Sequence, residues 1–198
     1  MRLLAIDTAT PRPSLAVAID DGAPRTVELP RLGAEALAPA VASLLLAVGL
    51  VPGDLDRIAV VSGPGSFTGL RSSLAFARGL ARATGALLVP VPTFETASGA
   101  VPVPPDADFL LEALRGEVHR RCRRGGVLSP GEERLSRETA ANDAVRAGVP
   151  AIDLGSEALL LAPAAADLAR RAPDAEPGSL VYGRLPAAIE RFGPGEAG

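Results

Sequence analysis

The sequence predicts an α/β protein that begins with a run of strands and continues with alternating helices and strands. Short apolar segments separated by turn residues occupy the N-terminal region, which is typical of strands. From Glu35 onward the apolar positions recur at helical spacing. A glycine-rich segment at residues 62–69 then links an apolar run to a second helical pattern. With 47% hydrophobic and 22% charged residues, the chain has the composition of a folded globular protein.

Three strands are predicted at the N-terminus. Residues 2–6 and 14–19 are apolar runs, and residues 26–29 form a third and shorter one. Asp21 and Gly22 lie between the second and third runs, and this dipeptide strongly favours a tight hairpin turn. Because such turns reverse the chain, we expect a three-stranded antiparallel meander.

Helices and strands are expected to alternate after the meander. The first helix is predicted over residues 35–48, with Pro39 in its first turn and Gly49 at its end. The elements predicted after it are a buried strand at 57–61, a helix at 68–84, a strand at 87–91, a short helix at 93–98 and a proline-rich linker at 102–105.

The second half of the chain predicts a smaller α/β unit. Its strand candidates are residues 109–113, 118–122 and 151–154, and a helix is predicted at 163–171. With the proline-rich linker as boundary, we expect two domains, an N-terminal one over residues 1–100 and a smaller C-terminal one over residues 101–198.

Residue types that are missing exclude several kinds of active site. All 20 basic residues are arginine, so the chain has no lysine for a phosphate-binding loop or a Schiff base. The single histidine, His119, and the single cysteine, Cys122, cannot form a zinc site of the usual kind. Both residues are expected to be structural. We therefore expect no catalytic residue, no bound cofactor and no metal.

Charge and hydropathy restrict the location and the partners of the protein. The formal net charge is −3 and no long basic run occurs, which argues against nucleic-acid binding by this chain alone. The longest apolar run, near residues 41–48, is far shorter than the roughly 18 residues of a membrane span. Asp7 interrupts the N-terminal apolar stretch, so no signal peptide is expected. One cysteine allows no internal disulfide, which suits the cytoplasm.

The glycine-rich segment at residues 62–69 has two interpretations. Glycines before a helix allow backbone N–H groups to approach a phosphate, and the helix dipole favours an anion there. The same pattern also makes a tight structural connection in which Ser66 or Thr68 caps the helix. The spacing of the residues does not decide between them.

The predicted order β-β-β-α-β-α-β over residues 2–91 is similar to one half of the actin, Hsp70 and sugar-kinase superfold, which contains a ribonuclease H-like core. In that superfold the first hairpin carries a phosphate motif of the form Asp-x-Gly-Thr. This chain has Asp7, Thr8, Ala9 and Thr10 at the corresponding positions. The methyl group of Ala9 would crowd the backbone approach that glycine permits.

More specifically, the chain resembles the TsaB family of bacterial tRNA-modification proteins. The resemblance rests on MRLLAIDTAT at residues 1–10 and on SGPGSFTGLRSSLAFARGLA at residues 62–81, with weaker support at 115–118 and 180–184. It implies an inactive paralogue of the transferase TsaD that pairs with TsaD and with the ATPase TsaE. Together these proteins form N6-threonylcarbamoyladenosine beside the anticodon of tRNAs that read codons beginning with adenine. The resemblance also implies a homodimer for the isolated chain and contact with tRNA only through the complex.

The resemblance further implies that two helices form the partner interface. The residues expected there are Leu37, Val41, Leu44, Leu45, Ser66, Phe67, Thr68, Gly69, Arg71, Leu74 and Arg78. Two alternatives remain open at this stage. The first helix could be buried within its own domain, and Arg71 and Arg78, which are two turns apart, could be solvated surface residues. An ATP-dependent phosphotransferase of the same superfold is the alternative function, and a peptidase is a third.

Overall fold

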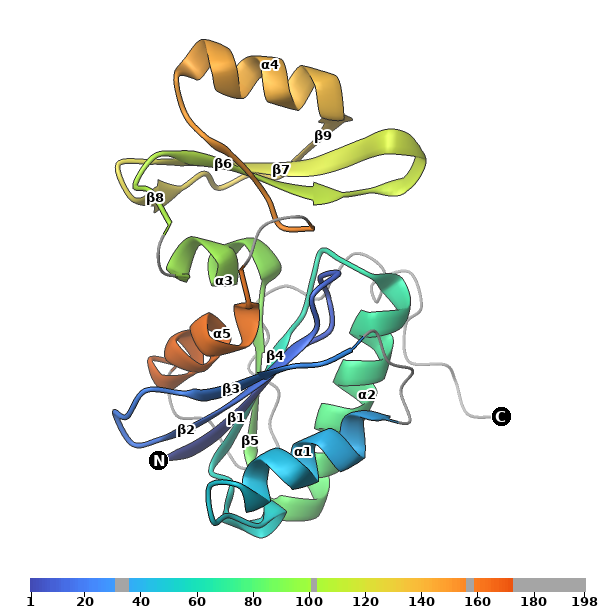
Figure 1. The fold of residues 1–198 in the computed structure, drawn as a ribbon, viewed down its shortest axis with the longest axis vertical. Coiled ribbons are helices and arrows are strands. Elements are labelled where there is room, and N and C mark those ends of the chain that lie inside the picture. Colours follow the sequence, from blue (N-terminus) through green and yellow to red (C-terminus); the bar gives the residue numbers. More distant parts are fainter. Residues whose placement is uncertain (31–35, 101–102, 156–158, 173–198) are drawn as a thin grey trace.

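The computed structural model describes residues 1–30, 36–100, 103–155 and 159–172, and these form two β-sheets with helices on both (Figure 1). The predicted α/β class is thus confirmed. Among the described residues, no helix has the length and hydropathy to cross a membrane.

The first sheet has five strands in the order β3-β2-β1-β4-β5. The first three pair antiparallel, as the turn residues predict, whereas β4 and β5 continue the sheet in parallel with β1. This is the strand arrangement expected for one half of the actin-like superfold. The strands are β1 (Arg2–Asp7), β2 (Ser14–Ile19), β3 (Arg25–Glu28), β4 (Arg57–Val61) and β5 (Leu87–Val91).

Both faces of this sheet are covered, which explains why its central strands are continuously apolar. Successive side chains of a strand point to opposite faces. Leu4 and Ile6 of β1 accordingly belong to the core under α1 (Leu37–Leu46) and α2 (Phe67–Thr84). Leu3 and Ala5 belong to the core under α5 (Leu161–Arg170) on the other face.

Helix α2 begins and ends at the residues that the sequence signals. The Ser66 hydroxyl accepts a hydrogen bond from the Gly69 N–H at 3.2 Å and so caps the N-terminus. Gly85 closes the helix in the left-handed conformation, with φ of 77°. Helix α1, which precedes α2 in the sequence, is shorter than the predicted 35–48. Glu35 lies outside the described residues. A short 3₁₀ turn, η2 (Pro52–Asp54), connects α1 to β4.

The second sheet has the strand order β10-β6-β7-β8, and β9 also pairs with β7. Strands β6 and β7 confirm two predicted strands, whereas β8, β9 and α4 were not predicted from the sequence. Helix α4 buries only Ala140 and Ala144, so its sequence has no apolar period of large residues. The elements are β6 (Ala107–Glu112), the 3₁₀ turn η3 (Leu114–Gly116), β7 (Glu117–Arg124), β8 (Val127–Leu128), β9 (Glu133–Ser136), α4 (Arg137–Ala147) and β10 (Ala151–Asp153).

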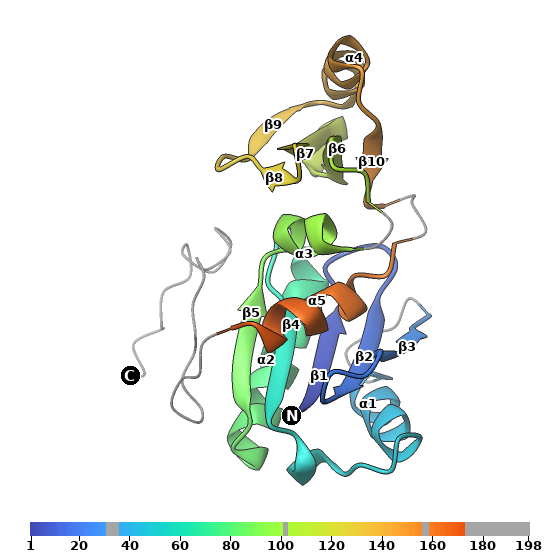
Figure 2. The same cartoon turned by 90° about the vertical axis from the view of Figure 1, so that its left-hand side faces the viewer.

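Helix α5 connects the two parts of the chain on either side of the predicted boundary at residue 100, and the division into two domains stays a prediction. It follows the second sheet in sequence but packs on β1, β2 and β4 of the first sheet (Figure 2). The Arg57 guanidinium of β4 donates to the carbonyl oxygens of Ala169 and Ala172 at 2.6 and 2.8 Å, and so fixes the C-terminal end of α5. Helix α5 packs on the first sheet because the face opposite α1 and α2 would otherwise be exposed to water.

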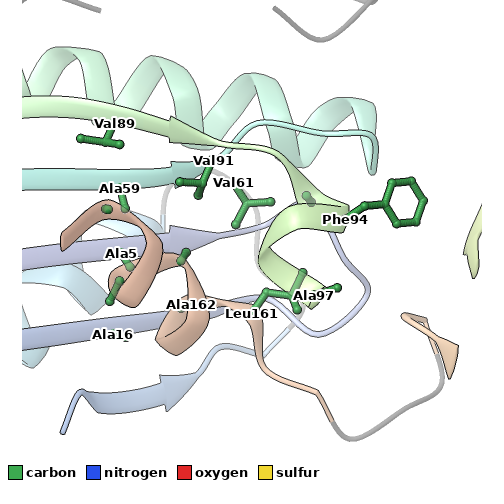
Figure 3. Packing of buried hydrophobic residues seen from close by; sticks show 14 of the residues in the cluster. Ala5, Ala16, Ala59, Val61, Val89, Val91, Phe94, Ala97, Leu161 and Ala162 are labelled. Atoms are coloured by element: carbon green, nitrogen blue, oxygen red, sulfur yellow. The ribbon is translucent and has the colours of Figure 1, made fainter. Parts of the chain in front are cut away.

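Helix α3 (Thr93–Gly99) lies between the two sheets and joins their cores (Figure 2). Figure 3 shows Ala97 of α3 beside Leu161 of α5, while the Phe94 ring points away from the first sheet. Phe94 belongs to the same buried cluster as Phe109 and Leu111 of β6. The Arg121 guanidinium of β7 adds an ion pair to Glu95 at 2.8 Å. One hydrophobic core therefore extends through both parts of the molecule.

Candidate functional site

The β1–β2 hairpin and the glycine-rich segment meet at the N-terminus of α2. The Ser66 N–H donates to the Ala9 carbonyl oxygen at 2.7 Å, and the Thr8 hydroxyl donates to the Gly69 carbonyl oxygen at 2.8 Å. The two segments that resemble phosphate-binding motifs thus bind each other directly.

Two glycines permit this contact because the backbones approach so closely. A Cβ atom on Gly69 would lie 1.9 Å from the Thr8 carbonyl oxygen, and one on Gly65 would lie 2.4 Å from that of Ala9. Two backbone N–H groups that could have faced an anion, those of Ser66 and Gly69, instead donate within the chain. Of the two interpretations of the glycine-rich segment, the contacts favour the tight structural connection.

Asp7 holds the hairpin turn from inside the protein. It is fully buried, and its two carboxylate oxygens accept hydrogen bonds from the Ala9 N–H at 2.8 Å and the Thr10 hydroxyl at 2.7 Å. Burial raises the pKa of Asp7 to about 6, although these hydrogen bonds act in the opposite direction. In this arrangement Asp7 closes a turn and does not face solvent.

A cavity of about 550 Å³ lies next to this contact, between the hairpin, the start of α2 and the end of β6. Among the described residues that line it, Glu112 is the only charged one. This part of the lining would present a carboxylate and no basic side chain to a polyphosphate, which is unfavourable. The remaining lining residues are Thr8, Ala9, Pro11, Pro13, Leu29, Pro30, Leu37, Gly65, Ser66, Thr68, Gly69, Ser72 and Leu111.

His119 and Cys122 both lie on β7 and cannot act together as base and nucleophile. They are three residues apart, so their side chains point to opposite faces of the strand. The imidazole Nδ1 of His119 contacts the Glu132 carboxylate at 2.5 Å, and burial is the main cause that raises the pKa of the Cys122 thiol. A raised pKa disfavours the reactive thiolate. Within the described part of the chain, no cluster of residues could hold a metal ion.

Four of the predicted interface residues lie inside the protein, and the prediction needs correction for them. They are at most 6% exposed and pack against β1, β2 and β4 within the core. A partner cannot reach them in this conformation, because the inward face of α1 is the face that carries the large apolar residues. These residues are Leu37, Val41, Leu44 and Leu45.

The other predicted interface residues lie at or near the surface, on α2 and the residue before it. Ser66, Phe67 and Thr68 are exposed at the start of the helix, with the Phe67 ring half exposed at 50%. The Arg71 guanidinium lies 5.2 Å from the centre of that ring, within cation–π distance. Gly69 contacts Thr8, Leu74 is partly buried, and Arg78 is exposed. Their role in an interface stays a prediction.

The outward side of α1 carries exposed residues that are absent from the predicted interface. Ala38, Ala42 and Leu46 recur every four residues and are all exposed, with Leu46 at 76%. On α2, Arg82 continues the stripe of Arg71 and Arg78. Spacings of four residues on α1 and of seven and four residues on α2 could have identified both sets. We call the exposed surface of these two helices, which lie side by side in Figure 1, the α1–α2 face, formed by Ala38, Ala42, Leu46, Phe67, Arg71, Ala75, Arg78 and Arg82.

Comparison with known proteins gives a consistent result. Residues 29–119 match the family model described as TsaD, tRNA N6-adenosine threonylcarbamoyltransferase. The tRNA threonylcarbamoyladenosine biosynthesis protein TsaB of Escherichia coli is 39% identical over 102 residues, which cover 50% of this chain and 44% of that protein. YeaZ of Pseudomonas aeruginosa superposes with a TM-score of 0.69 at 27% identity, over 85% of this chain and 90% of that one. The chain is thus similar to TsaB proteins, in sequence over about half of its length and in fold over most of it.

The similar proteins differ in how much of their length this chain matches. An uncharacterized protein of Mycobacterium tuberculosis is 35% identical over 127 residues, which cover 56% of its length. The chain thus spans about half the length of the curated relatives. The solved structure from Pseudomonas aeruginosa is covered almost completely. The fold is therefore shared along most of the chain, whereas sequence identity is confined to part of it.

Proposed function

We propose that this chain is a non-catalytic TsaB-type subunit that binds a TsaD-like transferase and acts with a TsaE-like ATPase. Its role is to support formation of N6-threonylcarbamoyladenosine in tRNA. The observation that carries the proposal is the closed contact between the hairpin and the glycine-rich segment, where Ser66, Thr8 and Gly69 bind each other. A subunit whose phosphate motif is occupied by its own backbone has to act through a partner.

Two features of this region support a non-catalytic role. The described residues that line the cavity contain one carboxylate and no basic residue, so they do not supply the charges that stabilise a transferring phosphoryl group. Asp7, the carboxylate at the position of the superfold's phosphate motif, is buried and hydrogen-bonded within its own turn. The same features argue against the phosphotransferase alternative.

The α1–α2 face supports pairing with another protein. A helix on the surface of a globular protein normally carries charged residues on its outer side. The outer side of α1 carries Ala38, Ala42 and Leu46 instead, and the helix has no charged residue at all. Covering such a surface removes apolar area from water, which favours association.

Reconstitution from purified components tests the proposal. The chain is combined with the TsaD-like and TsaE-like proteins of the same genome, threonylcarbamoyl-adenylate, ATP and an unmodified tRNA transcript. We expect modified adenosine only when all three proteins are present, with no product from this chain alone. Full product formation without this chain would contradict the proposal, and so would ATP turnover by the isolated chain that is lost in Asp7→Asn. In this role the chain acts in the cytoplasm and meets tRNA through the complex.

A further inference from the structure

The cavity beside the β1–β2 hairpin is lined by residues from both parts of the chain. Thr8, Pro11 and Leu37 line it from the part that contains the first sheet. Leu111 and Glu112, at the end of β6, line it from the second sheet. Its volume of about 550 Å³ lies within the range of roughly 300–1,000 Å³ that is typical of small-molecule sites. A molecule bound there would therefore contact both parts of the chain.

Apolar side chains form much of the described wall of this cavity. Besides Leu37 and Leu111, they are Ala9, Pro11, Pro13, Leu29 and Pro30. An apolar group that displaces water from such a wall removes apolar surface from water, which favours binding. The wall therefore favours a ligand with an apolar body, held in place by a small number of polar groups.

Three polar side chains of the lining have no partner among the described residues. The hydroxyls of Thr68 and Ser72 and the carboxylate of Glu112 form no hydrogen bond or ion pair with any of them. By contrast, the Ser66 hydroxyl is used within the chain, where it accepts from the Gly69 N–H. An ionised carboxylate can only accept hydrogen bonds, and a charged N–H donor gives it the strongest ones. The ligand group that matches Glu112 best is therefore an ammonium.

The N-terminus of α2, which also borders the cavity, acts on a charged ligand in the opposite direction. It carries the equivalent of about half a positive charge, whereas an ionised carboxylate carries a full negative charge. Two backbone N–H groups at this end, those of Ser66 and Gly69, already donate within the chain at 2.7 and 3.2 Å. The Glu112 carboxylate is therefore the larger charge, and it determines the sign of the ligand.

We propose that this cavity binds a small organic cation, in which an ammonium group is carried on an apolar body. The ammonium group donates to the Glu112 carboxylate, and the apolar body lies against Leu37 and Leu111. The hydroxyls of Thr68 and Ser72 remain available to a second polar group of the ligand. Binding of this kind does not require the TsaD-like partner, so its failure would leave the proposed function intact.

An NMR titration of the isolated, isotope-labelled chain tests both the site and the sign of its ligand. Three probes share a phenyl ring and differ in charge: 2-phenylethylammonium, neutral 2-phenylethanol and anionic phenylacetate. At low ionic strength we expect the ammonium probe to bind with a Kd of about 0.1–1 mM, as is reasonable for a ligand of this size. The alcohol should bind about three- to fivefold more weakly, which corresponds to one exposed ion pair, and phenylacetate more weakly still. The largest amide shifts should centre on Thr8, Gly65 and Gly69.

Glu112→Gln and Glu138→Gln form a matched pair of variants. Each removes one exposed carboxylate that has no partner among the described residues, and Glu138 lies on α4, outside the described cavity lining. We expect Glu112→Gln to weaken binding of the ammonium probe about three- to fivefold and to leave binding of the alcohol unchanged. Glu138→Gln should bind both probes as wild type does. Ser72→Phe, which fills the cavity, should abolish binding of both while the far-UV circular dichroism spectrum stays native.

Several outcomes would overturn the inference. Equal affinity for the three probes, or tightest binding of phenylacetate, would rule out a cation as the ligand. Amide shifts outside the lining, no binding at millimolar concentrations, or equal losses of affinity in the two glutamine variants would rule out the site. If Ser72→Phe unfolds, Glu112→Gln and Glu138→Gln still decide the matter, because both positions are exposed.

Discussion

Asp7 shows how a residue from a phosphate motif can be kept for a structural purpose. Its carboxylate is buried without a basic partner and is held by the Ala9 N–H and the Thr10 hydroxyl. Such a group costs stability when it is ionised, because burial disfavours the charged form. The pKa of Asp7 is accordingly raised to about 6, from an ordinary value of 3.8, with burial as the main cause.

The pKa of Asp7 predicts the pH dependence of stability. Between pH 4 and 6 the folded state binds the proton more tightly than the unfolded state does, so the free energy of unfolding falls as the pH rises through this range. Asp7→Asn cannot ionise; its amide oxygen can still accept from the Ala9 N–H, and its NH2 group can donate to the Thr10 hydroxyl, which reverses the direction of the second hydrogen bond. At pH 8 we expect this variant to be more stable than wild type by up to about 3 kcal/mol, with the difference vanishing near pH 4. Thermal melts over this pH range check the prediction, and a difference that stays constant with pH would contradict it.

Gly69 and Gly79 lie on the same helix and predict opposite effects of one methyl group. Gly69→Ala places a Cβ atom 1.9 Å from the Thr8 carbonyl oxygen, so the hairpin must move away from α2, at a cost of about 3 kcal/mol. At Gly79 no atom lies within 4 Å of the added Cβ, and alanine favours the helix by about 0.5–1 kcal/mol. Chemical denaturation measures both variants. Equal stabilities for the two would show that the close approach of hairpin and helix is not required.

At the scale of single elements, two adjacent leucines of α1 lie in different environments. Leu45 is fully buried against the first sheet, whereas Leu46 is 76% exposed on the α1–α2 face. A helical period places consecutive residues on different sides, so one position decides between core and surface. The sequence interpretation assigned Leu45 to the interface because it considered the apolar pattern without the position of the sheet.

Aspartate substituted at each of these two positions distinguishes an effect on folding from an effect on binding. Leu45→Asp buries an unpaired carboxylate and should lower the free energy of unfolding by about 4 kcal/mol or more. Leu46→Asp should change it by less than about 0.5 kcal/mol but weaken binding of the TsaD-like protein, since it places a charge on an apolar surface that the partner would cover. Circular dichroism melts and calorimetric titration measure the two effects. A Leu46→Asp variant that unfolds, or that binds as tightly as wild type, would contradict this assignment.

For the whole molecule, α5 and α3 join the buried residues of the two sheets into one cluster. Helix α5 covers Leu3 and Ala5 of β1, although about 160 residues separate these positions in the sequence. Arg57 fixes the end of α5, and α3 connects its core to Phe109 of the second sheet. We therefore expect the two parts of the chain to unfold together.

A fragment of residues 1–100 tests this unity. It contains all five strands of the first sheet and both helices of the α1–α2 face but lacks α5. Because one face of its sheet would be exposed to water, we expect no cooperative thermal transition and a tendency to aggregate. The full chain, which should melt in one cooperative step, is the control. A fragment with a dispersed proton NMR spectrum and a cooperative melt would show that the first sheet folds without α5.

Several features of this protein followed from the sequence alone. Local patterns act over a few residues, so apolar periods and turn residues were enough to predict the five strands of the first sheet, α1, α2 and α3. Two long motifs were enough to find the resemblance to TsaB proteins. Only the tertiary structure decided which of Leu45 and Leu46 meets the sheet, that α5 returns to the first sheet, and that the glycine-rich segment binds the hairpin. The reason is physical: periodicity shows that a residue must be covered, but contacts between distant segments decide what covers it.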